Sequence, residues 1–291
     1  MPDFSRRGGW RQRPHRHARR SPAPTPLARR WPVVVLVALA LAAGAGGALS
    51  AERPEVDAGM VAANAPAPAP FRSPSPAVTA SPSPSVLAPL LRLAGPVPVA
   101  GRGSFGYDDR PGATLGRAGR VQRYRVAVEN GAGEDVHDFS DVVQEALAGP
   151  GSWVDSGRLR LRRVPGGSPA EFTVFLATAR TAGRMCLAGG VDIRVGGRPY
   201  TSCRAPGKVI INLDRWRTSV PHFVRAGVPL SGYRLYVVNH EVGHQLGHRH
   251  ERCPGAGRPA PVMQQQSLFL DGCTANPWPY LGGRRYRGPS V

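Results

Sequence analysis

Residues 240–250, HEVGHQLGHRH, carry the strongest structural signal in this chain. His240 and His244 stand four residues apart, so on a helix they share one face and can bind one zinc ion. Gly247 permits the left-handed backbone conformation that ends many helices. Beyond that break the chain can turn back and bring His250 to the same ion. The stretch therefore predicts a zinc site at the end of a helix.

The residues between the histidines predict what the zinc does. Three neutral imidazoles leave the ion with a charge of +2 and a free position for water. Glu241 is expected to be the general base, which accepts a proton from that water and passes it to the leaving amine of a peptide bond. A helix continued through His248 would spread the ligands over about 12 Å, too far for one ion. We therefore expect His248 to lie in the outer shell of the site or on the surface.

The pattern HExxHxxGxxH resembles the zinc signature of the metzincin metallopeptidases. Pro261-Val262-Met263 is similar to the methionine turn of that family, in which Met263 would support the site. The resemblance implies an α+β fold: a twisted mixed β-sheet with packed helices and an active-site helix in residues 91–247, and a small irregular C-terminal subdomain in residues 248–291. Some members place a tyrosine ligand two residues after the methionine. Here that position is Gln265, so we expect three histidine ligands and one zinc ion.

Outside the motif, the chain is similar to a group of exported, metzincin-like actinobacterial proteins, a resemblance that adds no substrate. Hydrophobic periodicity predicts the other elements of the domain. Strands are expected at 121–129, 158–164, 171–177, 191–195 and 208–213. Helices are expected at 134–148 and 178–185, and from Ser231, as N-cap, to Leu246. The last helix should pack through an apolar stripe that contains Val238 and Val242, and hold its histidines on the opposite side.

The N-terminal part has the composition of an export segment. Residues 1–31 contain nine arginines and one acidic residue, which is typical of a disordered basic arm. Residues 33–51 carry no charge, and as a helix they would reach roughly 28 Å, close to the ~30 Å hydrocarbon core of a membrane. Because the arginines flank one side only, a single-pass signal anchor at 32–51 would leave the N-terminus in the cytoplasm. A signal peptide cleaved near Ala51, which would release a secreted protein, is the alternative.

The rest of the chain divides into a linker and a domain. Residues 52–90 are rich in proline, alanine and serine and predict a semi-extended tether. Residues 91–291 are expected to form one peptidase domain outside the cell.

All four cysteines lie in that domain, as expected for an oxidising compartment. Three pairings are possible. We expect Cys186–Cys203 and Cys253–Cys273, the pairs nearest in sequence. An alternative makes Cys253 a zinc ligand, which the even number of cysteines argues against.

Charge and export limit the partners. The net charge is +19, and a basic surface outside the cell is either simply solvated or attracts anionic cell-envelope polymers. Export argues against nucleic acid. The leading hypothesis is a membrane-tethered zinc endopeptidase that cleaves a peptide or protein substrate. The alternatives are a hydrolase of peptidoglycan cross-links and a non-catalytic, zinc-stabilised binding module; Glu241 argues against the module, because a structural zinc site has no use for a general base.

Overall fold

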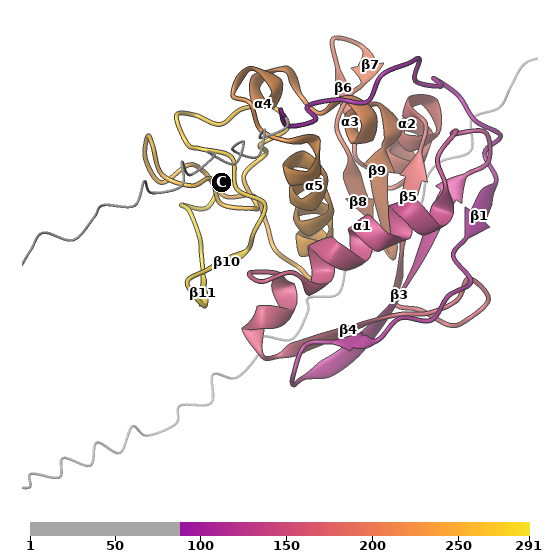
Figure 1. Ribbon diagram of the computed structural model, residues 1–291, viewed down its shortest axis with the longest axis horizontal. Coiled ribbons are helices and arrows are strands. Elements are labelled where there is room, and N and C mark those ends of the chain that lie inside the picture. Colours follow the sequence, from indigo (N-terminus) through magenta and orange to yellow (C-terminus); the bar gives the residue numbers. More distant parts are fainter. Residues whose placement is uncertain (1–87) are drawn as a thin grey trace, which may run out of the picture. The chain divides into compact units, whose positions relative to one another are not determined.

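A computed structural model describes residues 88–291 of the chain (Figure 1). The basic arm, the predicted membrane segment and nearly all of the linker lie outside the described residues. Among residues 88–291, no helix has the length and apolar character needed to cross a membrane.

The centre of the domain is a mixed seven-stranded sheet. In spatial order its strands are β2 (Thr114–Leu115), β4 (Leu159–Arg163), β3 (Arg120–Glu129), β5 (Phe172–Ala177), β9 (Lys208–Asn212) and β8 (Cys203–Ala205), and β1 (Phe105–Tyr107) pairs with the end of β3. The four inner strands are parallel to one another. The outer strands β1, β2 and β8 run antiparallel to their neighbours.

Helices cover both faces of this sheet. In chain order they are α1 (Val136–Ala148), the 3-10 helix η1 (Trp153–Ser156), α2 (Ala179–Ala188), α3 (Leu213–Thr218), α4 (Pro221–Arg225) and α5 (Leu230–Gln245). The larger hydrophobic core lies between the sheet and α1, α3 and α5, and a smaller core lies between the sheet and α2 (Figure 1). The fold is therefore α+β, as predicted.

The inner strands serve both cores at once. Val126 and Val128 of β3 belong to the larger core, whereas Ala127 between them belongs to the smaller one. Strand β5 repeats this alternation, and all six of its residues are buried. A strand that is covered on both faces consists almost entirely of apolar residues. For this reason residues 171–177, EFTVFLA, predicted a strand.

Most of the predicted elements are present, but one expected strand was wrong and several short strands were not predicted. Residues 191–195 do not form a strand of the central sheet: only Arg194–Val195 is extended, as β6, and it pairs with β7 (Arg198–Pro199) in a separate hairpin. Strand β8 was missed because it has only three residues. The disulfide Cys186–Cys203 joins it to α2.

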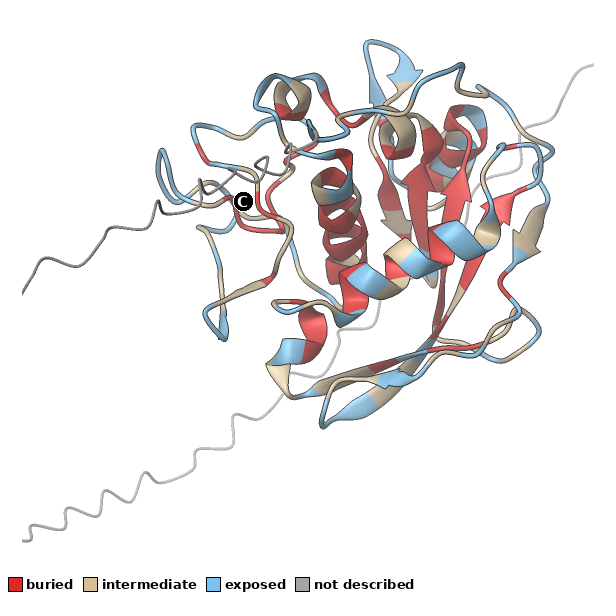
Figure 2. Cartoon of the chain, viewed as in Figure 1, coloured by how far each residue is buried: buried red, intermediate tan, exposed pale blue. Residues whose placement is uncertain are grey.

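Helix α5 is buried on nearly every side instead of having one apolar and one polar face (Figure 2). It lies between the sheet on one side and the C-terminal segment on the other. Ser231 does not cap it: Pro229 occupies the N-cap position, with no side-chain cap hydrogen bond. The first turn instead uses backbone, because the Leu230 N–H donates to the Leu90 carbonyl at 2.8 Å.

Residues 248–291 have little regular structure beyond the hairpin β10 (Tyr280–Leu281) and β11 (Arg284–Arg285). Covalent and ionic contacts hold this segment together. The disulfide Cys253–Cys273 has a Cα–Cα distance of 5.9 Å, and Glu251 and Arg285 form a nearly buried ion pair at 3.0 Å. The irregular C-terminal part predicted from sequence is therefore present.

Candidate metal centre

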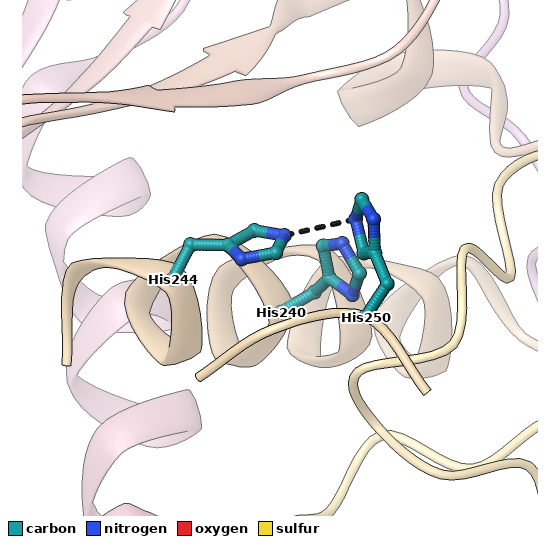
Figure 3. Close-up of side chains that lie close together, drawn as sticks. All are labelled: His240, His244 and His250. Atoms are coloured by element: carbon teal, nitrogen blue, oxygen red, sulfur yellow. Dashed lines mark hydrogen bonds between the residues drawn. The ribbon is translucent and has the colours of Figure 1, made fainter. Parts of the chain in front are cut away.

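The three predicted histidine ligands lie together at the C-terminal end of α5 (Figure 3). One ring nitrogen from each of His240, His244 and His250 lies within 4.8 Å of the other two. The closest pair is His244 Nε2 and His250 Nε2, at 3.0 Å. Residues four positions apart on a helix bring the first two together, and the segment after α5 brings the third.

Backbone carbonyls fix the orientation of the two helical rings. His240 Nδ1 lies 2.8 Å from the Val262 carbonyl, and His244 Nδ1 lies 2.9 Å from the His248 carbonyl. A carbonyl can only accept, so both rings carry their proton on Nδ1. This leaves Nε2 of both rings without a proton, the tautomer that a metal ligand requires.

The three rings are also neutral near pH 7. Burial lowers the pKa of each of them, and the neighbouring His244 lowers the pKa of His240 and His250 further. For His250 the pKa falls to about 4. The site thus combines three uncharged nitrogen donors.

The turn that delivers His250 is a Schellman motif. The Gly247 N–H donates to the His244 carbonyl at 3.1 Å, and the His248 N–H donates to the Gly243 carbonyl at 2.9 Å. Gly247 has φ +94°, a left-handed conformation that glycine adopts without a steric penalty. The glycine predicted as the pivot from sequence therefore ends the helix and reverses the chain.

Glu241 lies beside the histidines in a cavity of about 440 Å³. Glu241 is 5% exposed, and burial raises the pKa of its carboxyl group to about 8. Among the described residues, no hydrogen bond or ion pair engages its carboxylate. The carboxyl group is therefore free to act on a molecule that enters the cavity.

A turn at Pro261–Gln264 supports the centre from below. The Gln264 N–H closes it onto the Pro261 carbonyl at 2.9 Å, and Tyr236 of α5 donates its hydroxyl to the Gln264 carbonyl at 3.0 Å. Met263 is fully buried under α5, and a Cβ on Gly243 would lie only 2.4 Å from its sulfur. The turn therefore packs directly against the helix that carries the ligands.

The side chain of His248 is not part of the cluster, although its backbone carbonyl orients His244 from the outer shell, as expected. The ring of His248 stacks on Trp153, with ring centroids 4.3 Å apart. Trp153 in turn donates its indole N–H to the Asn239 carbonyl at 2.8 Å, and the guanidinium group of Arg285 lies over the Trp153 ring, 5.0 Å from its centroid. No sequence pattern predicted this role for Trp153, because the residue lies 86 positions from its partner on α5.

The two disulfides are those expected from proximity in sequence. Cys253 is bonded to Cys273, so its sulfur is not a metal donor. The described part of the chain contains no free cysteine.

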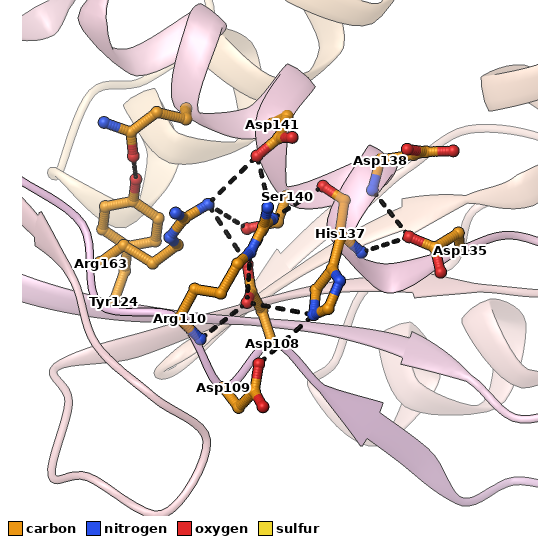
Figure 4. A network of polar contacts seen from close by, with 11 residues as sticks. Asp108, Asp109, Arg110, Tyr124, Asp135, His137, Asp138, Ser140, Asp141 and Arg163 are labelled. Atoms are coloured by element: carbon orange, nitrogen blue, oxygen red, sulfur yellow. Dashed lines mark hydrogen bonds and ion pairs between the residues drawn. The ribbon is translucent and has the colours of Figure 1, made fainter.

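A second group of potential ligands, Asp108, Asp109 and His137, lies at the start of α1 (Figure 4). The carboxylate of Asp108 is fully buried and already engaged by Arg110, at 3.0 Å, and by Arg163, at 3.2 Å. Both guanidinium groups occupy the positions that a cation would need. We therefore assign this group to an ion-pair network that joins the chain after β1 to α1 and β4.

A family model described as a protein of unknown function (DUF3152) matches residues 91–276. The chain belongs to this family. The DUF3152 match contains the three histidines, Glu241, Gly247 and Met263, whereas Arg285 lies beyond it. No curated protein and no solved structure matches the chain.

Proposed function

We propose that this protein is a zinc-dependent endopeptidase of metzincin type. The observation that supports it best is the combination of a three-histidine cluster with an unpaired carboxyl group, Glu241, in one cavity. A structural zinc site has four protein ligands, whereas a catalytic site keeps a position open for water or substrate. Here the described residues supply three donors around an accessible space.

The donor set fits zinc. Catalytic zinc sites use neutral imidazole ligands, and backbone carbonyls orient the rings of His240 and His244. The 3.0 Å contact between His244 and His250 is a hydrogen bond in which the metal would replace the shared proton. When bound, zinc supplies Lewis acidity toward water and toward a substrate carbonyl oxygen.

Glu241 supplies the proton transfer. Its position next to His240 on α5 places the carboxyl group at the edge of the same cavity. The positive charge of a bound zinc ion would lower the pKa of Glu241 and leave its carboxylate ionised. As a general base it would then accept a proton from the attacking water, and as a general acid deliver that proton to the leaving amine. Rigid support comes from Met263 and Tyr236, which hold α5 and the turn in one position.

The compartment agrees with this function. Two disulfides indicate an extracellular domain, because such bonds persist in oxidising compartments. We propose that residues 32–51 anchor the protein in the cell membrane and that residues 52–90 tether the domain to it. We also propose that the basic surface of the domain attracts anionic polymers of the cell envelope.

The test compares the full-length wild-type protein with Glu241→Gln. We expect both to bind one zinc ion per chain, measured by elemental analysis. The wild type should cleave members of a broad peptide library, and the variant should be slower by about 10²- to 10⁴-fold. Glu145→Gln, at an exposed glutamate on α1, is the matched control and should keep full activity.

Three results would change the conclusion. Cleavage of muropeptides without cleavage of ordinary peptides would favour a peptidoglycan cross-link hydrolase. Zinc binding without cleavage of either substrate would indicate a binding module. A protein that binds no zinc would contradict the whole proposal.

A further inference from the structure

A second cavity adjoins the metal centre. It has a volume of about 640 Å³ and lies between α2, the β6–β7 hairpin and the segment that precedes β1. Asp192 lines both this cavity and the one that contains the histidines, so the two spaces meet at that residue. Four arginines line the second cavity, which we call the arginine pocket: Arg180, Arg184, Arg194 and Arg198.

Most of the positive charge in the arginine pocket is not neutralised. Asp192 forms an ion pair with Arg194 at 2.7 Å, so these two charges cancel. Across residues 88–291, no carboxylate lies within ion-pair distance of Arg180, Arg184 or Arg198. Asp214 is the other acidic residue in the lining, and three free cations therefore face one anion.

Apolar side chains alternate with the arginines. Val99 and Leu187 line the pocket and are 63% and 60% exposed, among the most exposed large apolar residues of the domain. Their exposed apolar surface favours a ligand that carries an apolar group beside an anionic group.

The walls of the pocket are firmly built. The Arg180 N–H donates to the Val99 carbonyl at 3.1 Å, which ties the segment before β1 to α2. On the opposite wall, α2 approaches β7 so closely that a Cβ on Gly183 would lie 2.8 Å from Pro199. The pocket is therefore a feature of the packed fold and suits a ligand that extends from the metal centre.

We infer that the arginine pocket binds acidic side chains of the peptide whose scissile bond lies at the metal centre. This inference rests on the proposed peptidase function and adds a substrate class, peptides that carry acidic and apolar residues on one side of the cleavage point. An extended peptide advances about 3.3 Å per residue, so residues a few positions from that point reach the neighbouring cavity. Exposed arginines then attract carboxylates through hydrogen bonds and charge.

The experiment uses the full-length protein and pairs of peptides that carry Glu or the isosteric Gln at one position at a time. We expect Glu to be preferred at one or two positions on the same side of the scissile bond, by about tenfold in kcat/KM and mainly through KM. Arg180→Gln with Arg198→Gln removes two of the three free cations and should abolish most of the preference, measured as the ratio of kcat/KM for the Glu and Gln peptides. Arg162→Gln, an exposed arginine on β4 at the far side of the sheet, is the matched control and should keep the preference. In the wild type, raising the salt concentration should weaken the preference for Glu peptides.

Equal cleavage of the Glu and Gln peptides by the wild type would overturn the inference while leaving the peptidase proposal intact. A preference of the same size in the wild type and the double variant would overturn it too. If no peptide is cleaved, the peptidase proposal fails, and fluorescence anisotropy with the same peptides still tests the pocket: binding that favours Glu and needs both arginines supports it, and equal binding contradicts it. Tighter binding of polyphosphate at the same arginines would identify an anionic polymer as the occupant instead.

Discussion

At the scale of single residues, the site depends on which ring nitrogen each histidine leaves free. His240 and His244 donate from Nδ1 to backbone carbonyls, so their Nε2 atoms face the centre. His248 differs because its ring stacks on Trp153. Of the four histidines in residues 240–250, three thus point to one centre, and the fourth, His248, packs against Trp153.

His250→Ala and His248→Ala should therefore behave differently. Loss of His250 removes one of three donors, and we expect zinc affinity to fall by more than about 100-fold, a larger loss than for an outer-shell contact. Loss of His248 removes a stacking contact worth about 1 kcal/mol and should leave one zinc ion bound. Competition with a chromophoric chelator measures both affinities. Equal losses in the two variants would contradict the assignment of ligands.

At the scale of an element, α5 joins the ligands to the core. It is packed on almost all sides, and it ends in a Schellman motif at Gly247 that redirects the chain. Two other glycines lie inside this helix in different surroundings. At Gly243 a Cβ would meet Met263 at 2.4 Å and Trp153 at 2.6 Å, whereas at Gly232 the nearest atom would be 3.4 Å away.

This difference predicts opposite effects of alanine. Gly243→Ala should lower the free energy of unfolding by about 1–3 kcal/mol, because the added methyl group displaces the methionine turn. The matched Gly232→Ala should raise it by up to about 1 kcal/mol, since alanine favours a helix more than glycine does. Thermal or urea unfolding of the two variants measures the change. A Gly243→Ala protein as stable as the wild type would show that the turn does not press against α5.

At the scale of the whole molecule, ion pairs join the chain after β1 to β4 and to helix α1. Asp108, after β1, contacts Arg110 and Arg163, and Arg110 also contacts Asp141 on α1 (Figure 4). Burial by itself raises the pKa of Asp108, but hydrogen bonds from Arg110 and Ser140 and the charge of Arg163 outweigh it and lower the pKa to about 2.

The stability of the fold should therefore depend on pH through Asp108. Because its pKa is lower in the folded than in the unfolded protein, the stabilisation is complete above pH 4 and is lost as the pH falls through 2. We expect the stability advantage of the wild type over Asp108→Asn to shrink by about 2 kcal/mol between pH 5 and pH 2. Urea unfolding across that range measures it. Asp109→Asn, at a side chain that is 85% exposed, is the control, and an advantage independent of pH would contradict the network.

Local sequence was sufficient for the features that depend on short spacings. Three features depend only on residues close together in the chain, and each was predicted correctly. They are the shared helix face of His240 and His244, the helix end at Gly247, and strand β5 with its continuous apolar run. The nearest cysteine pairs are likewise close in sequence. The membrane segment and linker remain predictions.

Tertiary structure decided what depends on distant residues. The Val262 carbonyl orients His240, Trp153 holds His248 out of the cluster, and Arg285 pairs with Glu251 next to the third ligand. None of these contacts follows from periodicity, because each joins segments that meet only when the chain is packed. In the same way, β8 is too short to be read from its own residues and is a strand because β9 pairs with it. The motif of residues 240–250 by itself determined which side chains can bind a metal; the fold determined that three of them meet in one cavity, beside an unpaired carboxyl group and a pocket of arginines.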